Sequence, residues 1–310
     1  MRRSTASFVA LSAAILIHPG VPSLRSVAAA PHRIAVVEGL SSPEALSFDP
    51  GQKVYFISNI NGTPGTKHGT GFISRVTADG VLDSLHFIQG GRGGVALDAP
   101  MGSRVQGDTL WVLDVGVLRG FNTHTGAPIT TIDVSAVNPR FLNDLAIDPT
   151  GAFYITDTGV QFGADGAVTH PGPDQIIRVG HDRKVSVALA SPALMSPDGI
   201  DWDQRGKRFV LAPIGGPAVQ QWHAGDAAPS DVAKAKGMYD GIEIERGGTI
   251  LITSWADSTI STLEGSTLVP RIGKLPFPPA DVSMDVAHSR VGIVGLTANR
   301  FELWEWPFGK

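Results

Sequence analysis

The sequence predicts an all-β fold, a six-bladed β-propeller closed by an N-terminal strand that completes the last blade. A hairpin pattern recurs six times, at intervals of 57, 42, 55, 42 and 40 residues, close to the roughly 40–50 residues of a propeller blade. Glycine (37) and proline (22) are abundant, as expected for many short strands joined by tight turns. The last copy lacks a fourth strand, whereas an unpaired strand precedes the first copy.

The clearest copy of the pattern is FLNDLAIDPTGAFYITDTG, residues 141–159. Leu145 and Ile147 alternate with small or polar neighbours, a Pro-Thr-Gly turn follows, and a second apolar run comes after it. This arrangement predicts a β-hairpin. Asn143 and Asp144 would lie at its open end, just before the first strand.

The other copies align with this one on the alternating apolar pair of the first strand. The residues that precede this pair in successive copies are Glu44, Met101, Asn143, Asp198, Asp240 and Ala280. The first strand of each propeller blade lines the central channel, so residues at its start converge on one face. Side chains far apart in the sequence are therefore predicted to meet at the channel mouth.

Further strands complete each unit. Second strands are predicted at 54–58, 110–114, 153–157, 209–213, 250–255 and 291–296. Third strands are predicted at 71–77, 117–122, 175–179, 219–223, 259–264 and 300–306, and fourth strands in most units, for example at 81–89 and 129–134. Residues 33–38 would pair with the last unit and close the ring, and residues 231–238 could form at most a helical turn. A β-sandwich with a long insertion is the alternative, although sandwiches repeat about every 8–12 residues without a larger period.

The first thirty residues have a different character from the remainder. Arg2 and Arg3 precede an apolar run at 8–17, and small residues follow at 27–30, which is the pattern of a cleaved export signal. The run is too short for a membrane-spanning helix, which needs about 20 apolar residues. An uncleaved short anchor is the alternative. We therefore expect a signal peptide at 1–30, a single propeller domain at 31–310, no membrane span after cleavage, and a periplasmic or secreted protein.

Composition excludes several classes of function. Removing residues 1–30 takes away three arginines and no acid, so the formal net charge falls from −4 to −7. No basic cluster suggests binding to nucleic acid. The absence of cysteine excludes disulfides, thiolate nucleophiles and cysteine-zinc sites. The sequence also contains no HExxH motif and no GxSxG motif, which argues against a zinc protease and a serine hydrolase of the α/β type.

Four of the aligned residues share one chemistry. Glu44, Asn143, Asp198 and Asp240 are all hard oxygen donors, the ligands that Ca²⁺ prefers, with Mg²⁺ or Mn²⁺ as alternatives. Three carboxylates at one channel mouth would repel one another, and a bound divalent cation offsets that repulsion. Asp and Asn are also common turn residues, so a purely structural role before a strand is the competing interpretation.

The ordered set EALSFDP, NDLAIDPTGAFYITDTG, SPDGIDWDQRGKRFVLAP and DGIEIERGGTILITSW resembles the SMP-30/gluconolactonase family of six-bladed propellers, which includes sugar lactonases and is related in architecture to the paraoxonases. The likeness extends over nearly all of residues 33–306. The resemblance implies a divalent cation, commonly calcium, held by Glu44, Asn143, Asp198 and Asp240. Two departures stand out: Asp198 replaces the usual asparagine, and Met101 gives the second blade an apolar residue.

The resemblance also implies a mechanism. The cation would polarise a lactone carbonyl while a carboxylate takes a proton from the attacking water. Asp240 is the expected base, with Asp144 or Asp281 as replacements. The added charge of Asp198 would tighten cation binding but weaken the cation as a Lewis acid.

Other residues are candidates for substrate contact. Asn59 and Asn61 follow a second strand, and the glycine-rich loop after them could fold over the mouth with Lys67 and His68 facing the substrate. A mobile solvated loop is the alternative. Trp255 and Asp257 follow the second strand of the fifth copy and could form a wall of the pocket, and Asp281 is a further candidate for substrate contact.

The expected function is therefore divalent-metal-dependent hydrolysis of a small cyclic ester, with a lactone or sugar-like substrate. The rival, from a different class, is a non-catalytic exported propeller that binds a small ligand or protein and carries a structural metal ion. Asp198 and Met101 favour the rival slightly. The sequence does not indicate an oligomeric state.

Overall fold

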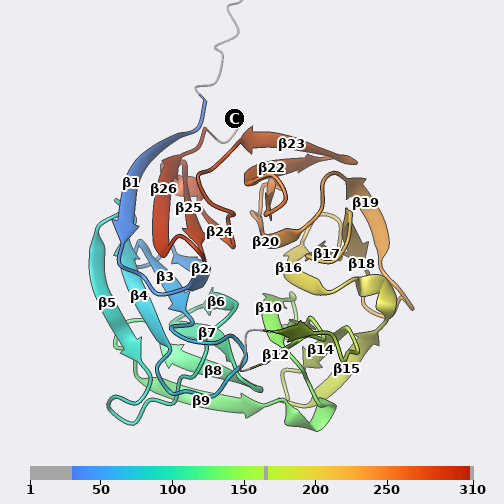
Figure 1. The fold of residues 1–310 in the computed structure, drawn as a ribbon, viewed down its shortest axis with the longest axis horizontal. Helices are drawn as coiled ribbons and strands as arrows, with labels where there is room; N and C mark the ends of the chain where they lie inside the picture. The colour runs from blue at the N-terminus through green and yellow to red at the C-terminus, as the bar shows by residue number, and fades with distance from the viewer. Residues whose placement is uncertain (1–29, 164–166, 308–310) are drawn as a thin grey trace, which may run out of the picture.

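A computed structural model describes residues 30–163 and 167–307 of the chain. Six four-stranded antiparallel sheets stand in a ring around a central channel (Figure 1). Blade one contains β2 (Pro43–Asp49), β3 (Val54–Asn59), β4 (Phe72–Thr77) and β5 (Leu82–Gln89). Blade two contains β6 (Ser103–Gln106), β7 (Thr109–Asp114), β8 (Val117–Asn122) and β9 (Pro128–Asp133). Blade three contains β10 (Leu142–Ile147), β11 (Phe153–Asp157), β14 (Gln175–Val179) and β15 (Val185–Ala190).

The second half of the chain continues the ring. Blade four contains β16 (Pro197–Asp203), β17 (Arg208–Pro213), β18 (Ala218–Trp222) and β19 (Ser230–Lys234). Blade five contains β20 (Tyr239–Ile244), β21 (Ile250–Ser254), β22 (Thr259–Glu264) and β23 (Thr267–Ile272). Blade six contains β24 (Val282–Asp285), β25 (Arg290–Gly295), β26 (Arg300–Glu305) and β1 (His32–Glu38).

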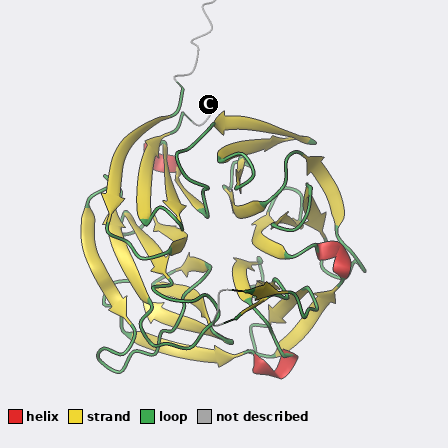
Figure 2. Cartoon of the chain, viewed as in Figure 1, coloured by secondary structure: helices red, strands yellow, loops and turns green. Residues whose placement is uncertain are grey.

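A few elements lie outside the four-stranded sheets (Figure 2). A small hairpin of β12 (Gln161–Phe162) and β13 (Val168–Thr169) is inserted between β11 and β14. Three single-turn 3₁₀ helices, η1 (Ser135–Val137), η2 (Pro192–Leu194) and η3 (Val286–His288), lie in connections. None of the helices in the described part of the chain is long and apolar enough to cross a membrane.

The ring closes as the sequence predicts. β1 pairs antiparallel with β26, with Val37 opposite Phe301, so the N-terminal strand is the fourth strand of the last blade and covers its open edge. The predicted second, third and fourth strands are confirmed to within one residue. The expected signal peptide lies almost wholly outside the described residues and stays a prediction.

One secondary-structure expectation is wrong. Residues 231–238 do not form a helical turn, because 230–234 are strand β19, which pairs with β18 and buries Ala233. Most of its residues are exposed or half-buried, as expected for the outermost strand of a blade.

The core lies between neighbouring blades. Tyr154 of blade three packs on Phe209 of blade four, with ring centroids 4.4 Å apart, and Trp222 stacks on Phe209 at 5.6 Å. Blades one and six are joined in the same way by Tyr55 and Phe301, at 5.3 Å. Burying each such side chain contributes roughly 1.5–3 kcal/mol, so aromatic packing between blades fixes the ring without disulfides.

A local irregularity at the start of the inner strands shapes the channel mouth. The pairing register shifts at the start of β2, β10, β16 and β20. A bulge of this kind puts an extra residue into one strand and redirects its side chains. In β10, both Asn143 and its neighbour Asp144 consequently line the same pocket at the channel mouth.

Candidate functional site

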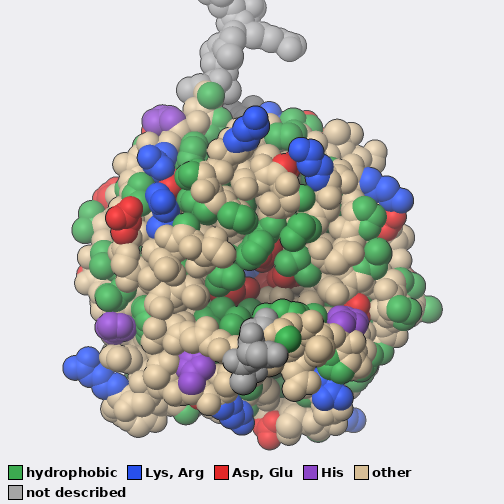
Figure 3. Space-filling view, in the orientation of Figure 1, with side chains coloured by type: hydrophobic (Ala, Val, Ile, Leu, Met, Phe, Trp, Pro, Cys, Tyr) green, Lys and Arg blue, Asp and Glu red, His purple; other side chains and the backbone are tan. Residues whose placement is uncertain are grey.

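The four predicted oxygen donors meet at one end of the channel. Glu44, Asn143, Asp198 and Asp240 line a single pocket, together with Gly102, Asp144 and Asp281. Acidic side chains are visible at the bottom of the central depression, surrounded by hydrophobic ones (Figure 3). The free space in the pocket is about 10 Å³, which is close to the size of one water-sized sphere.

The spacing of the carboxylates fits a single cation. Glu44, Asp198 and Asp240 each offer an oxygen, and these three oxygens lie within 4.8 Å of one another. Two oxygens bound to one Ca²⁺ at about 2.4 Å can be at most about 4.8 Å apart. The three carboxylates could therefore bind one calcium ion together.

Two further acceptors in the pocket lack hydrogen-bond donors. Asn143 Oδ1 and Glu44 Oε2 are buried and have no hydrogen-bond partner within the described residues. The Asn143 side-chain amide donates to Thr158 Oγ1 at 3.1 Å, and Thr158 Oγ1 donates to the Pro197 carbonyl at 2.8 Å. Buried acceptors are normally satisfied, so these two oxygens fit the role of cation ligands.

The electrostatics of the pocket also favour a cation. Burial, followed by the charges of Asp198 and Asp281, raises the pKa of Glu44 well above its usual value. Burial raises the pKa of Asp240 in the same way, with added repulsion from Asp198 and Glu44, while the indole N–H of Trp255 has a smaller, opposite effect. The pKa of Asp198 is also raised well above its usual value, mainly by burial. A divalent cation would stabilise the ionised forms of these carboxylates.

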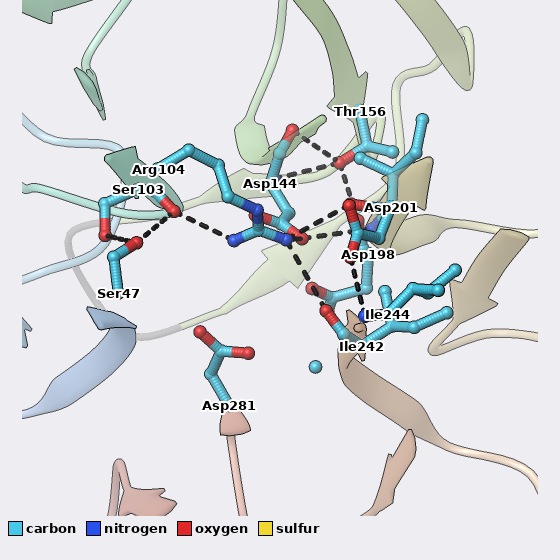
Figure 4. Close-up of polar contacts among 12 residues, drawn as sticks. Ser47, Ser103, Arg104, Asp144, Thr156, Asp198, Asp201, Ile242, Ile244 and Asp281 are labelled. Atoms are coloured by element: carbon cyan, nitrogen blue, oxygen red, sulfur yellow. Dashed lines mark hydrogen bonds and ion pairs between the residues drawn. The ribbon is translucent and has the colours of Figure 1, made fainter. Parts of the chain in front are cut away.

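A second level of charged side chains lies deeper in the channel. Arg104, on β6, donates from Nη1 to the Ser103 carbonyl at 2.8 Å and from Nη2 to Asp144 Oδ2 at 3.3 Å (Figure 4). Nη2 also lies 3.3 Å from the Ile200 carbonyl. The Arg104 side chain is only 13% exposed, so its guanidinium is held inside the channel.

The carboxylates around Arg104 respond to its charge. Burial raises the pKa of Glu243 to about 8, that of Asp281 to about 7 and that of Asp201 to about 6, and in each case the charge of Arg104 partly opposes the rise. Burial disfavours the charged guanidinium, but the charges of Asp144 and Asp201 outweigh it and raise the pKa of Arg104. Arg104 is therefore a permanent cation among these acids.

Asp144 connects the two levels. Its Oδ2 accepts from Arg104 and from the Ile200 N–H at 3.0 Å, whereas Oδ1 is buried with no partner in the described chain. A Cβ at Gly102 would lie 2.6 Å from this Oδ1, so the glycine of blade two leaves the space that Asp144 occupies. Burial raises the pKa of Asp144, and Arg104 with the backbone donors opposes the rise.

Several predicted substrate contacts have a structural role instead. Asn59 is fully buried: its Oδ1 accepts from the Ser41 N–H at 3.0 Å and its Nδ2 donates to the Ile57 carbonyl at 3.0 Å. Asn61 donates to the Thr70 carbonyl at 2.8 Å and thereby closes the base of the loop.

His68 is held by contacts within its own loop. Its Nδ1 lies 2.8 Å from Thr70 Oγ1, and its Nε2 lies against Gly62 within the loop. Sequence reasoning could not show what these polar side chains bind, because their partners come from neighbouring loop and strand residues.

The remaining candidates do lie near the mouth. Asp281 lines the pocket and accepts from the Leu46 N–H at 2.9 Å and the Val282 N–H at 2.8 Å. Trp255 is close enough to Asp240 to influence its pKa. Lys67 lines a neighbouring cavity, and Gly65 of the same loop lies against Phe141, so the loop does reach blade three.

Sequence reasoning missed Arg104 and its acidic neighbours. Arg104, Asp201 and Glu243 occupy equivalent positions in three copies of the repeat, three residues after Met101, Asp198 and Asp240. Charged residues at an equivalent position of inner strands were the available signal, because such positions face the channel rather than solvent.

Comparisons of the sequence with protein-family models and with curated proteins find no match. Solved structures with the same architecture include a gluconolactonase from Xanthomonas campestris, at 16% identity and a TM-score of 0.66, covering 94% of this chain and 99% of that chain. A luciferin-regenerating enzyme matches at 12% identity and a TM-score of 0.63, covering 87% of this chain and 94% of that one. The fold of this chain is thus the six-bladed propeller of the SMP-30/gluconolactonase-like proteins.

Proposed function

We propose that the protein is a divalent-metal-dependent hydrolase of the lactonase type that opens a small cyclic ester. The observation that carries the proposal is the convergence of three carboxylate oxygens within 4.8 Å of one another, beside the unpartnered oxygen of Asn143. The likeness of the fold to that of a gluconolactonase supports the same reaction class.

Glu44, Asn143, Asp198 and Asp240 would hold the cation, with Ca²⁺ preferred for an all-oxygen ligand set and Mg²⁺ or Mn²⁺ as alternatives. A cation bound there would polarise the lactone carbonyl and favour attack by water. The contacts of Asn143 support this role, because Thr158 holds its amide nitrogen while Oδ1 has no partner in the described chain.

We assign the role of general base to Asp240. Its carboxylate lies in the pocket beside Trp255 and, having two oxygens, can offer one to the cation and the other to the proton of the attacking water. Asp144 supports the reaction from the next level: Arg104 and the Ile200 N–H fix its Oδ2 while its Oδ1 has no partner in the described structure.

Hydrolysis of a panel of neutral sugar lactones and acyl lactones tests the proposal. We expect turnover that is lost in EDTA and restored by calcium. Turnover that is insensitive to EDTA, or no turnover of any lactone by the calcium-loaded protein, would overturn it. Calcium-induced thermal stabilisation without turnover would instead support the rival, a ligand-binding propeller with a structural ion.

We also propose that the protein is exported, to the periplasm or the medium, on the basis of the basic and apolar pattern of its first thirty residues. Cell fractionation with N-terminal sequencing tests this. A mature protein that begins near residue 31 is expected, and an unprocessed cytoplasmic protein would contradict it.

A further inference from the structure

Beside the metal pocket lies a second cavity, of about 150 Å³. It begins one residue away from the pocket at two places in the chain, just before β6 and at the start of β10, because Met101 and Leu142 line the cavity while Gly102 and Asn143 line the pocket. We propose that this cavity binds an anionic substituent of the substrate, so that the preferred lactone carries a carboxylate or a phosphate group. The inference rests on the proposed lactonase function.

Two cationic side chains line the cavity. Lys67 comes from the loop between β3 and β4, and Arg140 precedes β10. Both are exposed, and neither forms an ion pair with a carboxylate in the described part of the chain. The backbone at Arg140 is fixed, since its N–H donates to Asp157 at 3.0 Å and that of Phe141 at 2.7 Å.

The one acidic residue in the lining is already neutralised. Asp114 accepts from Arg119 at 2.7 Å and from the backbone N–H groups of Asp98 and Ala99. Arg140 uses Nε for a weak bond to the Gly172 carbonyl at 3.4 Å, which leaves its terminal nitrogens for a ligand. Lys67 and Arg140 therefore give the cavity a net positive charge.

The floor of the cavity is apolar. Met101 and Phe141 form part of it, and Phe162 packs on Phe141 with centroids 5.0 Å apart. A low-dielectric floor beneath two cations strengthens their attraction for an anion. The volume is much larger than one water needs, and it is enough for a carboxylate or phosphate group. Met101, which leaves blade two without a metal ligand, has a role here as a wall.

The position of this cavity next to the acidic mouth favours an anionic ligand. Glu44, Asp198 and Asp240 would repel an anionic substrate, and the two cations of the adjoining cavity would offset that repulsion. A guanidinium with free terminal nitrogens also binds carboxylate and phosphate through two parallel hydrogen bonds. A neutral lactone would gain little from either side chain.

The test compares three lactones: gluconolactone, which is neutral, glucarolactone, which carries a carboxylate, and phosphogluconolactone. The variant is Lys67→Met with Arg140→Met. The control is Arg92→Met with Lys274→Met, which removes the same charge from exposed loops after β5 and β23 that do not line the cavity. Circular dichroism confirms that both double variants fold.

We expect kcat/KM for one of the anionic lactones to exceed that for gluconolactone, and the Lys67/Arg140 variant to lose about tenfold or more of this preference through KM. Its loss of kcat/KM for gluconolactone should be much smaller than its loss for that anionic lactone. Comparison of glucarolactone with phosphogluconolactone shows whether the cavity binds a carboxylate or a phosphate group. Equal loss for neutral and anionic lactones, or the same loss in the control, would overturn the inference and leave the lactonase proposal intact.

Direct binding decides the inference if no lactone is hydrolysed. Calorimetry with glucarate and with phosphogluconate should show binding of at least one of them to the wild type and the control, and about tenfold weaker binding to the Lys67/Arg140 variant. If neither anion binds the wild type, or if the binding is unchanged in that variant, the cavity is not an anion site.

Discussion

At the mouth of the channel, Glu44, Asp198 and Asp240 face one another and form no ion pair within the described chain. One level deeper, the guanidinium of Arg104 lies among carboxylates and bonds to Asp144 and to backbone carbonyls. Both levels concentrate acidic groups on strands that meet around the channel axis. The difference is that the deeper level contains its own cation, whereas the mouth leaves its carboxylates free for one from solution.

We infer that the charge of Arg104 is structural, whereas the carboxylates of the mouth are those that would bind the proposed cation. A buried guanidinium cannot be exchanged, so it fixes side chains and supports the ring. Ionised carboxylates beside an asparagine oxygen with no partner in the described chain are costly for the apo protein, and a bound cation would offset that cost. Substitutions in one level at a time should therefore affect activity, stability and calcium binding differently.

Replacing Asp240 with asparagine removes the proposed base and one charge from the mouth. We expect kcat/KM for a lactone to fall by about 10²-fold or more, because a positioned base contributes about 10²–10⁴-fold. Steady-state hydrolysis measures this. Asp203→Asn is the matched control, since Asp203 is buried at the far end of β16 and bonds to a turn. Equal losses in the two variants would contradict the assignment.

Replacing Arg104 with methionine removes the cation of the deeper level. We expect the free energy of unfolding to fall by about 3–5 kcal/mol, because not one but several buried carboxylates, Asp144 among them, lose the charge that partly offsets their burial. Arg119→Met is the control: Arg119 is also 13% exposed and pairs with the buried Asp114, but it lies outside the channel lining. Chemical denaturation of the apo proteins should show the larger loss for Arg104→Met. A loss below about 1 kcal/mol would show that Arg104 is not needed there.

The deeper carboxylates predict how apo stability depends on pH. The pKa of Glu243 is raised to about 8 and that of Asp201 to about 6, so the folded protein binds more protons than the unfolded chain between about pH 4 and 8. Stability must then fall as the pH rises through this window. We expect the Tm of the EDTA-treated protein to decrease from pH 5 to pH 8. A Tm that rises over this range would contradict the raised pKa values of Glu243 and Asp201.

The smallest effect concerns the orientation of Asn143. Thr158→Val removes the hydroxyl that holds its amide nitrogen, and we expect calcium binding to weaken about tenfold, as is typical for partners of metal ligands. Thr123→Val is the control, because the buried hydroxyl of Thr123 has no hydrogen-bond partner in the described chain. Calorimetry that finds the same Kd in both variants would remove Asn143 from the proposed ligand set.

The fold could be predicted because its signals are local and repeated. Each hairpin carries alternating apolar residues and a turn, and the strand missing from the last blade matches the extra strand before the first. The convergence of Glu44, Asn143, Asp198 and Asp240 followed from that repeat alone. The hairpin of β12 and β13 has only two residues per strand, too few to show a period.

The deeper level could not be predicted in the same way. Arg104 lies in the weakest copy of the repeat, where β6 is only four residues long, and a lone arginine in a strand is more often exposed. Asn59 shows the opposite error, since a polar residue after a strand usually lies in a solvated loop. In both cases the deciding fact is a hydrogen-bond partner from another segment, as with the Ile200 carbonyl that faces Arg104.

Calcium titration of the metal-free protein by calorimetry, alongside Glu44→Gln, tests the central claim most directly. The account predicts one calcium ion per chain for the wild type and a loss of about tenfold or more in affinity for the variant, which removes one of three converging carboxylates. A wild-type protein that binds no calcium, magnesium or manganese, or a variant that binds as tightly as wild type, would contradict it.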